Sequence, residues 1–192
     1  PSVNPSAPTA LPAQCPVAKV TPLVDATGLA AKAGVASINV KDERTRMGLG
    51  SFKALGAAYV IAHDAAAIGG DDLSNVLSDR TYVTASAGNH GMSVAAGAKV
   101  FGAKAVIYLA AAVPESFAVR LRDMGADVVP AADNYAASID AAMRDRAANG
   151  WTVLPDSPAA NTHDAPHVTT EGSSVLTHEV RTPTAPSRTR IL

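Results

Sequence analysis

The sequence contains one cysteine, few aromatic side chains and little charge of either sign. Because Cys15 has no second cysteine to pair with, an intrachain disulfide framework and a thiolate zinc site are both excluded. So little cysteine fits a reducing compartment, and we expect a cytoplasmic protein in which this thiol is incidental. The 16 Lys and Arg nearly balance the 17 Asp and Glu, so no basic surface for nucleic acid or an anionic membrane is present. Apolar runs such as 106–113 are too short to cross a bilayer.

Small apolar side chains are what the sequence has in abundance. Hydrophobic residues make up 47% of the chain and aromatic residues only 4%, so the core is expected to consist mostly of small side chains. Such a core suits helices that pack closely on a sheet. The length of 192 residues predicts one domain or slightly more. The chain starts at Pro1 without a methionine or a leader, and we expect it to be part of a longer reading frame.

The two ends of the chain differ in composition from its middle. Six of the 13 prolines lie within the first 22 residues. Because each proline fixes φ and removes a backbone donor, residues 1–20 are predicted to form an extended arm. Residues 181–192 are rich in Pro, Thr and Arg and lack an apolar period, so a disordered tail is predicted there.

Between these ends, predicted strands alternate with predicted helices. Short β-rich or apolar runs predict strands at 37–40, 81–86, 105–109, 127–129 and 151–154. Helical spacing of apolar residues, together with the glycines that follow, predicts helices at 51–68, 91–101, 114–124 and 134–149. This alternation is typical of βαβ units, so the fold class is predicted as α/β with a Rossmann-like parallel sheet.

The first unusual loop is the sequence GLGSFK at 48–53. Ser51 is a good N-cap for the predicted helix 51–68, which would place Lys53 in its first turn. A cation there faces the positive end of the helix dipole, and that field favours the neutral amine that Schiff-base chemistry requires. A solvated lysine at the start of a helix is the alternative interpretation of this loop.

The second unusual loop is SAGNHG at 86–91, between a predicted strand and a predicted helix. Gly88 and Gly91 let the backbone turn sharply and expose N–H groups at a helix N-terminus, where anions bind. An ordinary strand-to-helix turn capped by Asn89 is the alternative. The loop lacks the full glycine pattern of a dinucleotide site and the lysine of a phosphate-binding loop, so a nucleotide-binding protein is a weak hypothesis.

Taken together, several motifs resemble fold-type II pyridoxal-phosphate enzymes, and among these the diaminopropionate ammonia-lyases most closely. The motifs are Thr21-Pro22-Leu23, Lys41-Asp42-Glu43, RMGLGSFKALG at 46–56, TASAGNHG at 84–91 and GAKAVIY at 102–108. The resemblance runs from about residue 21 to residue 180. The lysine loop and the asparagine loop, in this order and about thirty residues apart, carry most of its specificity.

The resemblance implies roles for particular residues. Lys53 would hold pyridoxal 5'-phosphate as a Schiff base and move the Cα proton of a small amino-acid substrate, while Asn89 would bind the ring 3'-oxygen. The substrate carboxylate would bind at the loop formed by Ser86, Gly88, Asn89 and His90. Asp156 matches a carboxylate that assists proton transfer in the family, and a simple turn residue is the alternative.

The resemblance also implies a tryptophan-synthase-β-like fold. Residues 55–155 would form a smaller Rossmann-like domain, and 21–54 with 156–180 would belong to an incomplete larger domain. The implied activity of the full-length enzyme, expected to be a homodimer, is α,β-elimination of 2,3-diaminopropionate to pyruvate and ammonia.

The sequence departs from the family pattern in ways that keep alternatives open. Ala87 replaces an aspartate found in ammonia-lyases that process both isomers, which makes the loop resemble that of threonine and serine dehydratases. Gly125, Gly150 and Gly172 are too widely separated to form a cup for the cofactor phosphate, and residues 158–180 follow the pattern loosely. The alternatives are therefore a threonine/serine dehydratase or a fragment that does not hold the cofactor.

Metal binding is not expected from this sequence. The candidate ligands His163, His167 and His178 are spread over a polar stretch, and no ligand spacing repeats among them.

Overall fold

The computed structural model describes residues 17–86, 88–156 and 165–181. Of the tail predicted at 181–192, Arg181 ends a described helix; residues 182–192 and most of the predicted arm, including Cys15, lie outside the described residues. Within the described ranges no helix is both long enough and apolar enough to cross a membrane.

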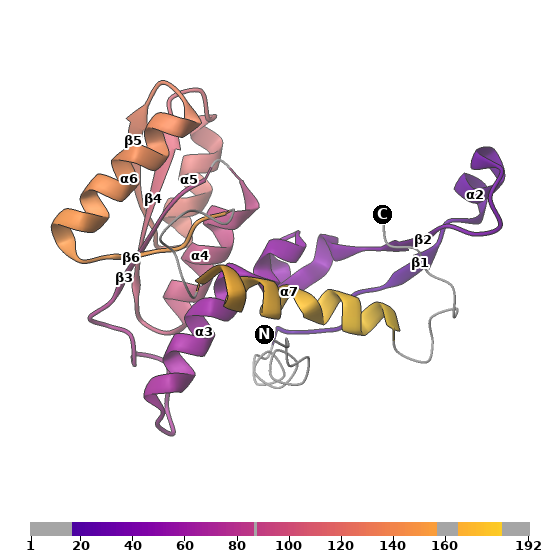
Figure 1. The fold of residues 1–192 in the computed structure, drawn as a ribbon, viewed down its shortest axis with the longest axis horizontal. Helices are drawn as coiled ribbons and strands as arrows, with labels where there is room; N and C mark the ends of the chain where they lie inside the picture. Colours follow the sequence, from indigo (N-terminus) through magenta and orange to yellow (C-terminus); the bar gives the residue numbers. More distant parts are fainter. Residues whose placement is uncertain (1–16, 87, 157–164, 182–192) are drawn as a thin grey trace.

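A parallel sheet lies at the centre of the larger lobe in Figure 1. Its strands are β3 (Thr81–Ala85), β4 (Lys104–Ala110), β5 (Asp127–Ala132) and β6 (Thr152–Val153), in the order β5-β4-β3-β6. Every neighbouring pair is parallel. These four strands confirm the α/β prediction.

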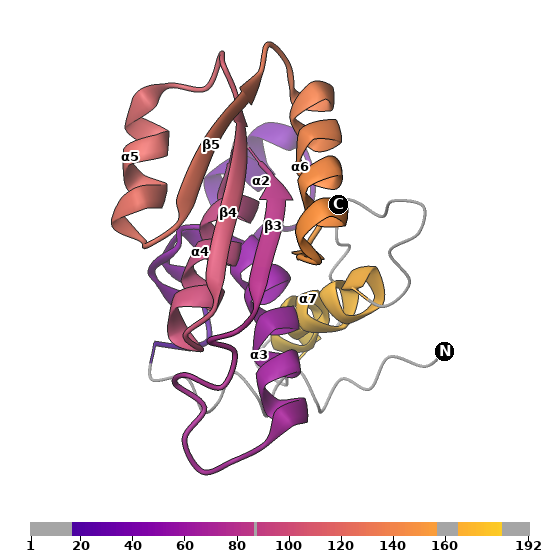
Figure 2. The same ribbon diagram turned by 90° about the vertical axis from the view of Figure 1, so that its left-hand side faces the viewer.

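Helices cover both faces of this sheet. Figure 2 shows α4 (Asn89–Val100) and α5 (Glu115–Asp123) on one face and α6 (Tyr135–Asn149) on the other. Because successive residues of a strand point to opposite faces, Ile107 packs toward the first face and Tyr108 toward α6. Both side chains are at least 98% buried, as expected of a strand covered on both sides.

The ends of these helices follow from local chemistry. The side chain of Asn134 accepts a hydrogen bond from the backbone N–H of Ala137 and so caps α6. Gly150 ends the same helix with φ of +70°, and Gly125 follows α5 with φ of +90°, both in the left-handed region that favours glycine. The helix ends predicted at these glycines are confirmed.

A layer formed by α3 (Ala57–Ile68) packs against α4 at very short range. A Cβ on Gly97 would lie 3.0 Å from Cα of Ala58, so only glycine lets the two helices approach this closely. Ser93, also on α4, is fully buried, and its hydroxyl accepts a hydrogen bond from the N–H of Ala58 at 3.1 Å. The N-terminus of α3 is therefore capped by a side chain of another helix.

The prediction of a single helix over residues 51–68 is wrong. The chain forms a short 3₁₀ helix, η3 (Phe52–Leu55), breaks at Gly56, and only then begins α3. Lys53 is therefore not in the first turn of an α-helix, and the dipole argument for its neutral amine does not apply. The Phe52 side chain, on this 3₁₀ helix, is 46% exposed.

The C-terminal helix α7 (Ala165–Arg181) explains this break. It crosses η3 and α3 so closely that a Cβ on Gly172 would lie 2.1 Å from the carbonyl oxygen of Leu55. A Cβ on Gly56 would lie 3.1 Å from the side chain of Thr169 on α7. A continuous helix through Gly56 would move this carbonyl and Gly56, the two groups against which α7 packs.

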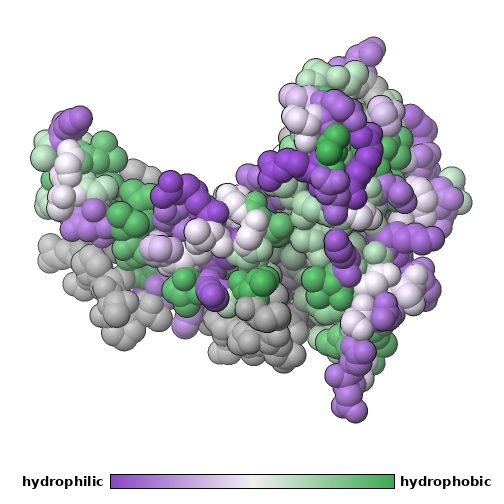
Figure 3. All heavy atoms as spheres, turned by 180° about the vertical axis from the view of Figure 1, so that it is seen from behind, coloured by the Kyte–Doolittle hydropathy of each residue, from purple (hydrophilic) through white to green (hydrophobic). Residues whose placement is uncertain are grey.

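The remaining elements form an arm, residues 17–48, that extends away from the sheet (Figure 1). Strands β1 (Leu23–Asp25) and β2 (Asn39–Lys41) pair antiparallel, with α2 (Thr27–Ala33) between them and η2 (Glu43–Gly48) after them. The strand predicted at 37–40 corresponds to β2, whereas β1 and α2 were not predicted. Hydrophobic patches are visible on the arm in Figure 3. Within the arm, the side chain of Leu29 is 53% exposed.

A buried ion cluster joins the base of the arm to α7. The guanidinium of Arg46 donates hydrogen bonds to Glu43 and to Glu179, and Lys41 pairs with the same Glu179 carboxylate at 2.6 Å. The Arg46 and Glu179 side chains are only 3% and 10% exposed. Burial raises the pKa of Glu179, but the hydrogen bonds from Arg46 and Lys41 outweigh burial and place the net pKa below its usual range.

Replacing Gly172 with alanine tests the crossing of α7. The added methyl group overlaps the Leu55 carbonyl, so Gly172→Ala is expected to lower the free energy of unfolding by about 1–3 kcal/mol in urea denaturation. Gly28→Ala in α2 is the matched control because nothing lies within 4 Å of its Cβ position, and it should be neutral or slightly stabilising. Equal midpoints for wild type and Gly172→Ala would contradict the crossing.

Replacing Glu179 with glutamine tests the ion cluster. Loss of one partner from a buried pair is expected to cost about 3 kcal/mol at neutral pH. Because the pKa of Glu179 is lowered in the folded state, the stability it contributes is lost as pH falls through that pKa, so the variant and wild type should converge in acid. Glu115→Gln, which removes an exposed pair with Arg122, should change stability by less than about 1 kcal/mol.

Candidate active site

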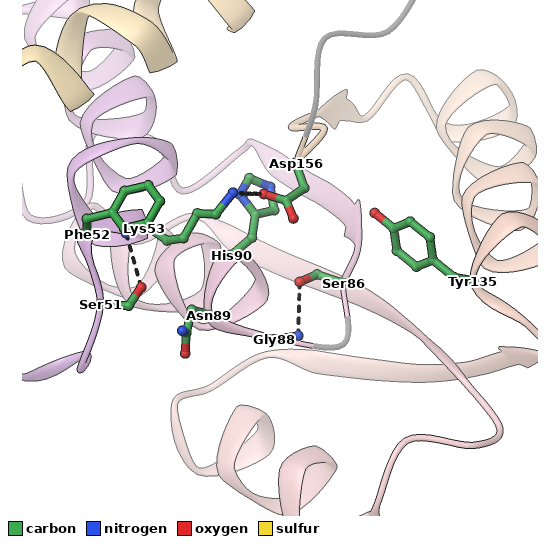
Figure 4. A pocket seen from close by; sticks show the side chains of 9 residues that line it. All are labelled: Ser51, Phe52, Lys53, Ser86, Gly88, Asn89, His90, Tyr135 and Asp156. Atoms are coloured by element: carbon green, nitrogen blue, oxygen red, sulfur yellow. Dashed lines mark hydrogen bonds and ion pairs between the residues drawn. The ribbon is translucent and has the colours of Figure 1, made fainter. Parts of the chain in front are cut away.

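A pocket of about 350 Å³ lies at the carboxyl end of the parallel strands. Figure 4 shows its lining, which comes from η3, the loop after β3, the start of α6 and the segment after β6. The lining residues are Ser51, Phe52, Lys53, Ser86, Gly88, Asn89, His90, Tyr135 and Asp156. All six residues predicted as site residues are therefore brought together. Ligands bind at this edge of open α/β sheets.

Lys53 enters the pocket from η3 with its backbone held on both sides. Its N–H donates to the hydroxyl of Ser51 at 3.1 Å, and its carbonyl accepts from the hydroxyl of Ser93 at 2.8 Å. The side chain is 33% exposed and its Nζ lies 5.7 Å from the centre of the Phe52 ring. The backbone of Lys53 is therefore fixed, whereas the end of its side chain is accessible.

Asp156 meets Lys53 across the pocket. Its Oδ1 forms an ion pair and hydrogen bond with Nζ of Lys53, although the two residues are 103 positions apart. Asp156 follows β6, and the N–H of Leu154 donates to the carbonyl of Val83 at 2.9 Å, which fixes this segment to the sheet. Asp156 therefore follows a strand, as the turn-residue alternative requires, and in addition has a charged partner in the pocket.

The His90 imidazole lies behind this pair rather than in the open pocket. It is 4% exposed, with Nε2 2.9 Å from the Leu154 carbonyl and Nδ1 3.6 Å from Oδ1 of Asp156. Burial lowers the pKa of His90, and the nearby charge of Lys53 adds to this effect. The carbonyl of Leu154 and the carboxylate of Asp156 oppose it, but the net pKa stays below the usual value.

The asparagine loop is arranged by the hydroxyl of Ser86. This oxygen accepts hydrogen bonds from the N–H of Gly88 at 3.3 Å and of Gly91 at 3.0 Å, so its own proton remains available to an acceptor. Among the described residues, the backbone N–H groups of Asn89 and His90 have no partner. They are the first N–H groups of α4, where an anion is stabilised. Ala87 lies outside the described residues.

Asn89 places a polar side chain at the exposed edge of the pocket. In the described part of the chain, no hydrogen-bond partner for its amide is present, so the donor and acceptor are both available to a ligand. A planar amide can act on a ring oxygen or on a carboxylate.

Tyr135 is one of three lining residues, with Ser51 and Phe52, that were not predicted as site residues. It is the first residue of α6, and Figure 4 shows its hydroxyl directed toward Asp156 and Ser86. Burial raises the pKa of Tyr135, and the charge of Asp156 adds to this. Its position after β5, at the carboxyl edge of the sheet, was the signal that could have identified it.

Metal coordination finds no support in the described ranges, where no group of three or more His, Cys, Asp or Glu side chains could hold an ion. His167 and His178 lie on α7, and His163 lies outside the described residues.

Comparisons with curated proteins give relatives with a common activity. A diaminopropionate ammonia-lyase of Salmonella typhimurium is 31% identical over 173 residues, which cover 83% of this chain and 43% of the relative. The corresponding Escherichia coli enzyme is 34% identical over 145 residues, covering 71% of this chain and 36% of the relative. The chain thus spans less than half the length of these relatives. An L-threonine ammonia-lyase of Thermotoga maritima is 37% identical over 95 residues, half of this chain and 21% of that enzyme.

Comparisons with solved structures also find a diaminopropionate ammonia lyase. Holo diaminopropionate ammonia lyase from Escherichia coli superposes with a TM-score of 0.84 at 29% identity, covering 92% of this chain and 48% of that one. A pyridoxal 5'-phosphate-dependent aspartate racemase shares the fold, with a TM-score of 0.75 at 20% identity over 92% of this chain and 49% of that chain. The family described as "Pyridoxal-phosphate dependent enzyme" matches residues 16–180. Because this match covers most of the chain, and the pocket contains a lysine, the chain belongs to the pyridoxal-phosphate-dependent enzymes.

Proposed function

We propose that this chain is the lysine-bearing part of a carbon–nitrogen lyase that eliminates ammonia from 2,3-diaminopropionate and yields pyruvate. The observation that carries the proposal is the convergence of Lys53, Asn89 and Asp156 on one pocket from three separate elements. The substrate is inferred from the diaminopropionate ammonia-lyases among the relatives.

The donor set of the pocket fits the reactive part of pyridoxal phosphate. The cofactor needs a primary amine for its aldehyde, a polar partner for its ring oxygen and room for a planar ring. Lys53, the unpartnered amide of Asn89 and the pocket of about 350 Å³ supply these. A glycine cup for the phosphate is not present in the described ranges, where Gly125 and Gly150 end helices and Gly172 forms the α7 crossing.

Different residues of the chain would then transfer the proton, stabilise charge and bind the substrate carboxylate. When bound, pyridoxal phosphate supplies the electron sink that makes the Cα proton of an amino acid removable. The Lys53 amine would take and return this proton, and the Asp156 carboxylate beside it would hold the charged form of the amine in place. The N–H groups of Asn89 and His90, which have no partner among the described residues, would bind the substrate carboxylate at the start of α4.

The domain division is also proposed, with 55–155 as the smaller domain and 21–54 with 156–180 in the larger one. The contacts of α7 with η3 and with the arm support grouping the ends of the chain. The homodimer and the cytoplasmic location remain predictions.

A threonine/serine dehydratase of the same fold is the second candidate. The similarity to the L-threonine ammonia-lyase of Thermotoga maritima favours it, as does alanine at position 87. The two candidates differ in the group that leaves Cβ, an amine or a hydroxyl. A folded chain that does not retain the cofactor is the third outcome.

Lys53→Ala tests cofactor attachment. Wild type mixed with pyridoxal phosphate should develop a visible absorption band, and borohydride should then attach the cofactor irreversibly to Lys53, as seen by peptide mass spectrometry. The Lys53→Ala variant should show neither, whereas Lys99→Ala, which removes an exposed lysine on α4, should match wild type. Attachment at another lysine would contradict the assignment, and no attachment in wild type would favour the fragment.

Asp156→Asn tests the role of the carboxylate. Loss of the charged partner of Lys53 should lower kcat for pyruvate release from 2,3-diaminopropionate about 100-fold or more, while the visible band is retained. Asp133→Asn changes an exposed aspartate between β5 and α6 and should leave the rate unchanged. Measuring keto-acid release from serine, which gives pyruvate, and from threonine, which gives 2-oxobutyrate, distinguishes the lyase from the dehydratase.

A further inference from the structure

The proposed function gives His90 a role through its backbone only, yet the imidazole is one of the most buried groups of the pocket. Nε2 lies 2.9 Å from the carbonyl of Leu154, and this oxygen can only accept a hydrogen bond. Nε2 must therefore carry the proton, and a neutral imidazole then has an unprotonated Nδ1. With 4% exposure, the ring has almost no contact with water.

Nδ1 of His90 faces the centre of the pair formed by Lys53 and Asp156. It lies 3.6 Å from Oδ1 of Asp156, the same oxygen that accepts from Nζ of Lys53. An ammonium group has three protons to donate, so the imidazole nitrogen and the carboxylate can share it. The hydrogen bond to Leu154, two residues before Asp156, also ties the ring to the segment that carries the carboxylate.

We propose that His90 is a positioning residue for the reactive lysine, an inference that rests on the proposed function of Lys53. Its neutral imidazole, anchored at Nε2 to the Leu154 carbonyl, presents Nδ1 as an acceptor beside the Lys53 amine and keeps the Asp156 carboxylate directed at that amine. The ring can do this only in the Nε2–H form.

Protonation of His90 reverses this arrangement. The imidazolium carries a proton on Nδ1, which would donate to Asp156 and compete with Lys53 for the carboxylate. The groups that face this site are Lys53 on η3, Asp156 after β6 and Tyr135 on α6. Because burial lowers the pKa of His90, the competing form is reached only at a pH below the usual histidine range.

The test is ¹⁵N NMR of the imidazole rings in the cofactor-free chain, followed as a function of pH. At neutral pH, His90 is expected in the Nε2–H tautomer. Asp156→Asn removes the negative charge that favours the imidazolium, so the His90 titration midpoint should shift to lower pH. Lys53→Met removes the opposing positive charge, so the midpoint should shift to higher pH.

Conservative variants separate positioning from packing. Lys53→Arg and Asp156→Glu keep the charges and should return the midpoint toward that of wild type. The resonances of His63, on an exposed position of α3, should respond to none of these changes and report an intact fold. An Nδ1–H tautomer, or a midpoint unmoved by both charge-removing variants, would overturn the proposal. These readouts need no bound cofactor, so a failure to attach pyridoxal phosphate leaves this test unaffected.

Discussion

The position of Lys53 depends on one hydroxyl group contributed by a different helix. Ser93 of α4 donates to the carbonyl of Lys53 and accepts from the N–H of Ala58, and so spans the break at Gly56. The bond to Ala58 is buried and the bond to Lys53 is partly buried, and an unsatisfied buried polar group costs about 1–3 kcal/mol. The break at Gly56 is therefore stable because Ser93 satisfies the backbone groups on either side of it. The same helix, α4, thus positions Lys53 and presents Asn89.

Glycine is used at the two crossings that fix this frame. At Gly97 the contact is with Ala58 of α3, and at Gly172 it is with the carbonyl of Leu55. A core of small side chains allows backbones to approach in this way, which is how a chain with 4% aromatic residues still buries its sheet. The low aromatic content and the close helix crossings therefore both reflect a core of small side chains.

Sequence reasoning located the sheet well because the signals there are local. The continuous apolar run of β4 and the stop at Gly150 each depend on neighbours within a few residues. The helix across Gly56 was mispredicted because its interruption depends on Gly172, more than a hundred residues later. Apolar spacing cannot register a contact at that separation.

The site shows the same division. The lysine and asparagine loops were recognisable from composition and order, and the pocket contains both. The pairing of Lys53 with Asp156 and the orientation of His90 toward Leu154 depend on where β6 lies beside β3, which spacing does not determine. Tyr135 was missed because a tyrosine at a helix start carries no motif.

The contact of α7 with η3 bears on the order in which the protein acquires its structure during synthesis. The segment containing Lys53 leaves the ribosome before α7, and the helix that packs against it is complete only at Arg181. Contacts between such distant parts of a chain form late and slowly, because the loop between them must close first. The sheet can assemble from neighbouring βαβ units as they emerge, whereas Lys53 gains its final surroundings only after nearly all of this sequence has been made.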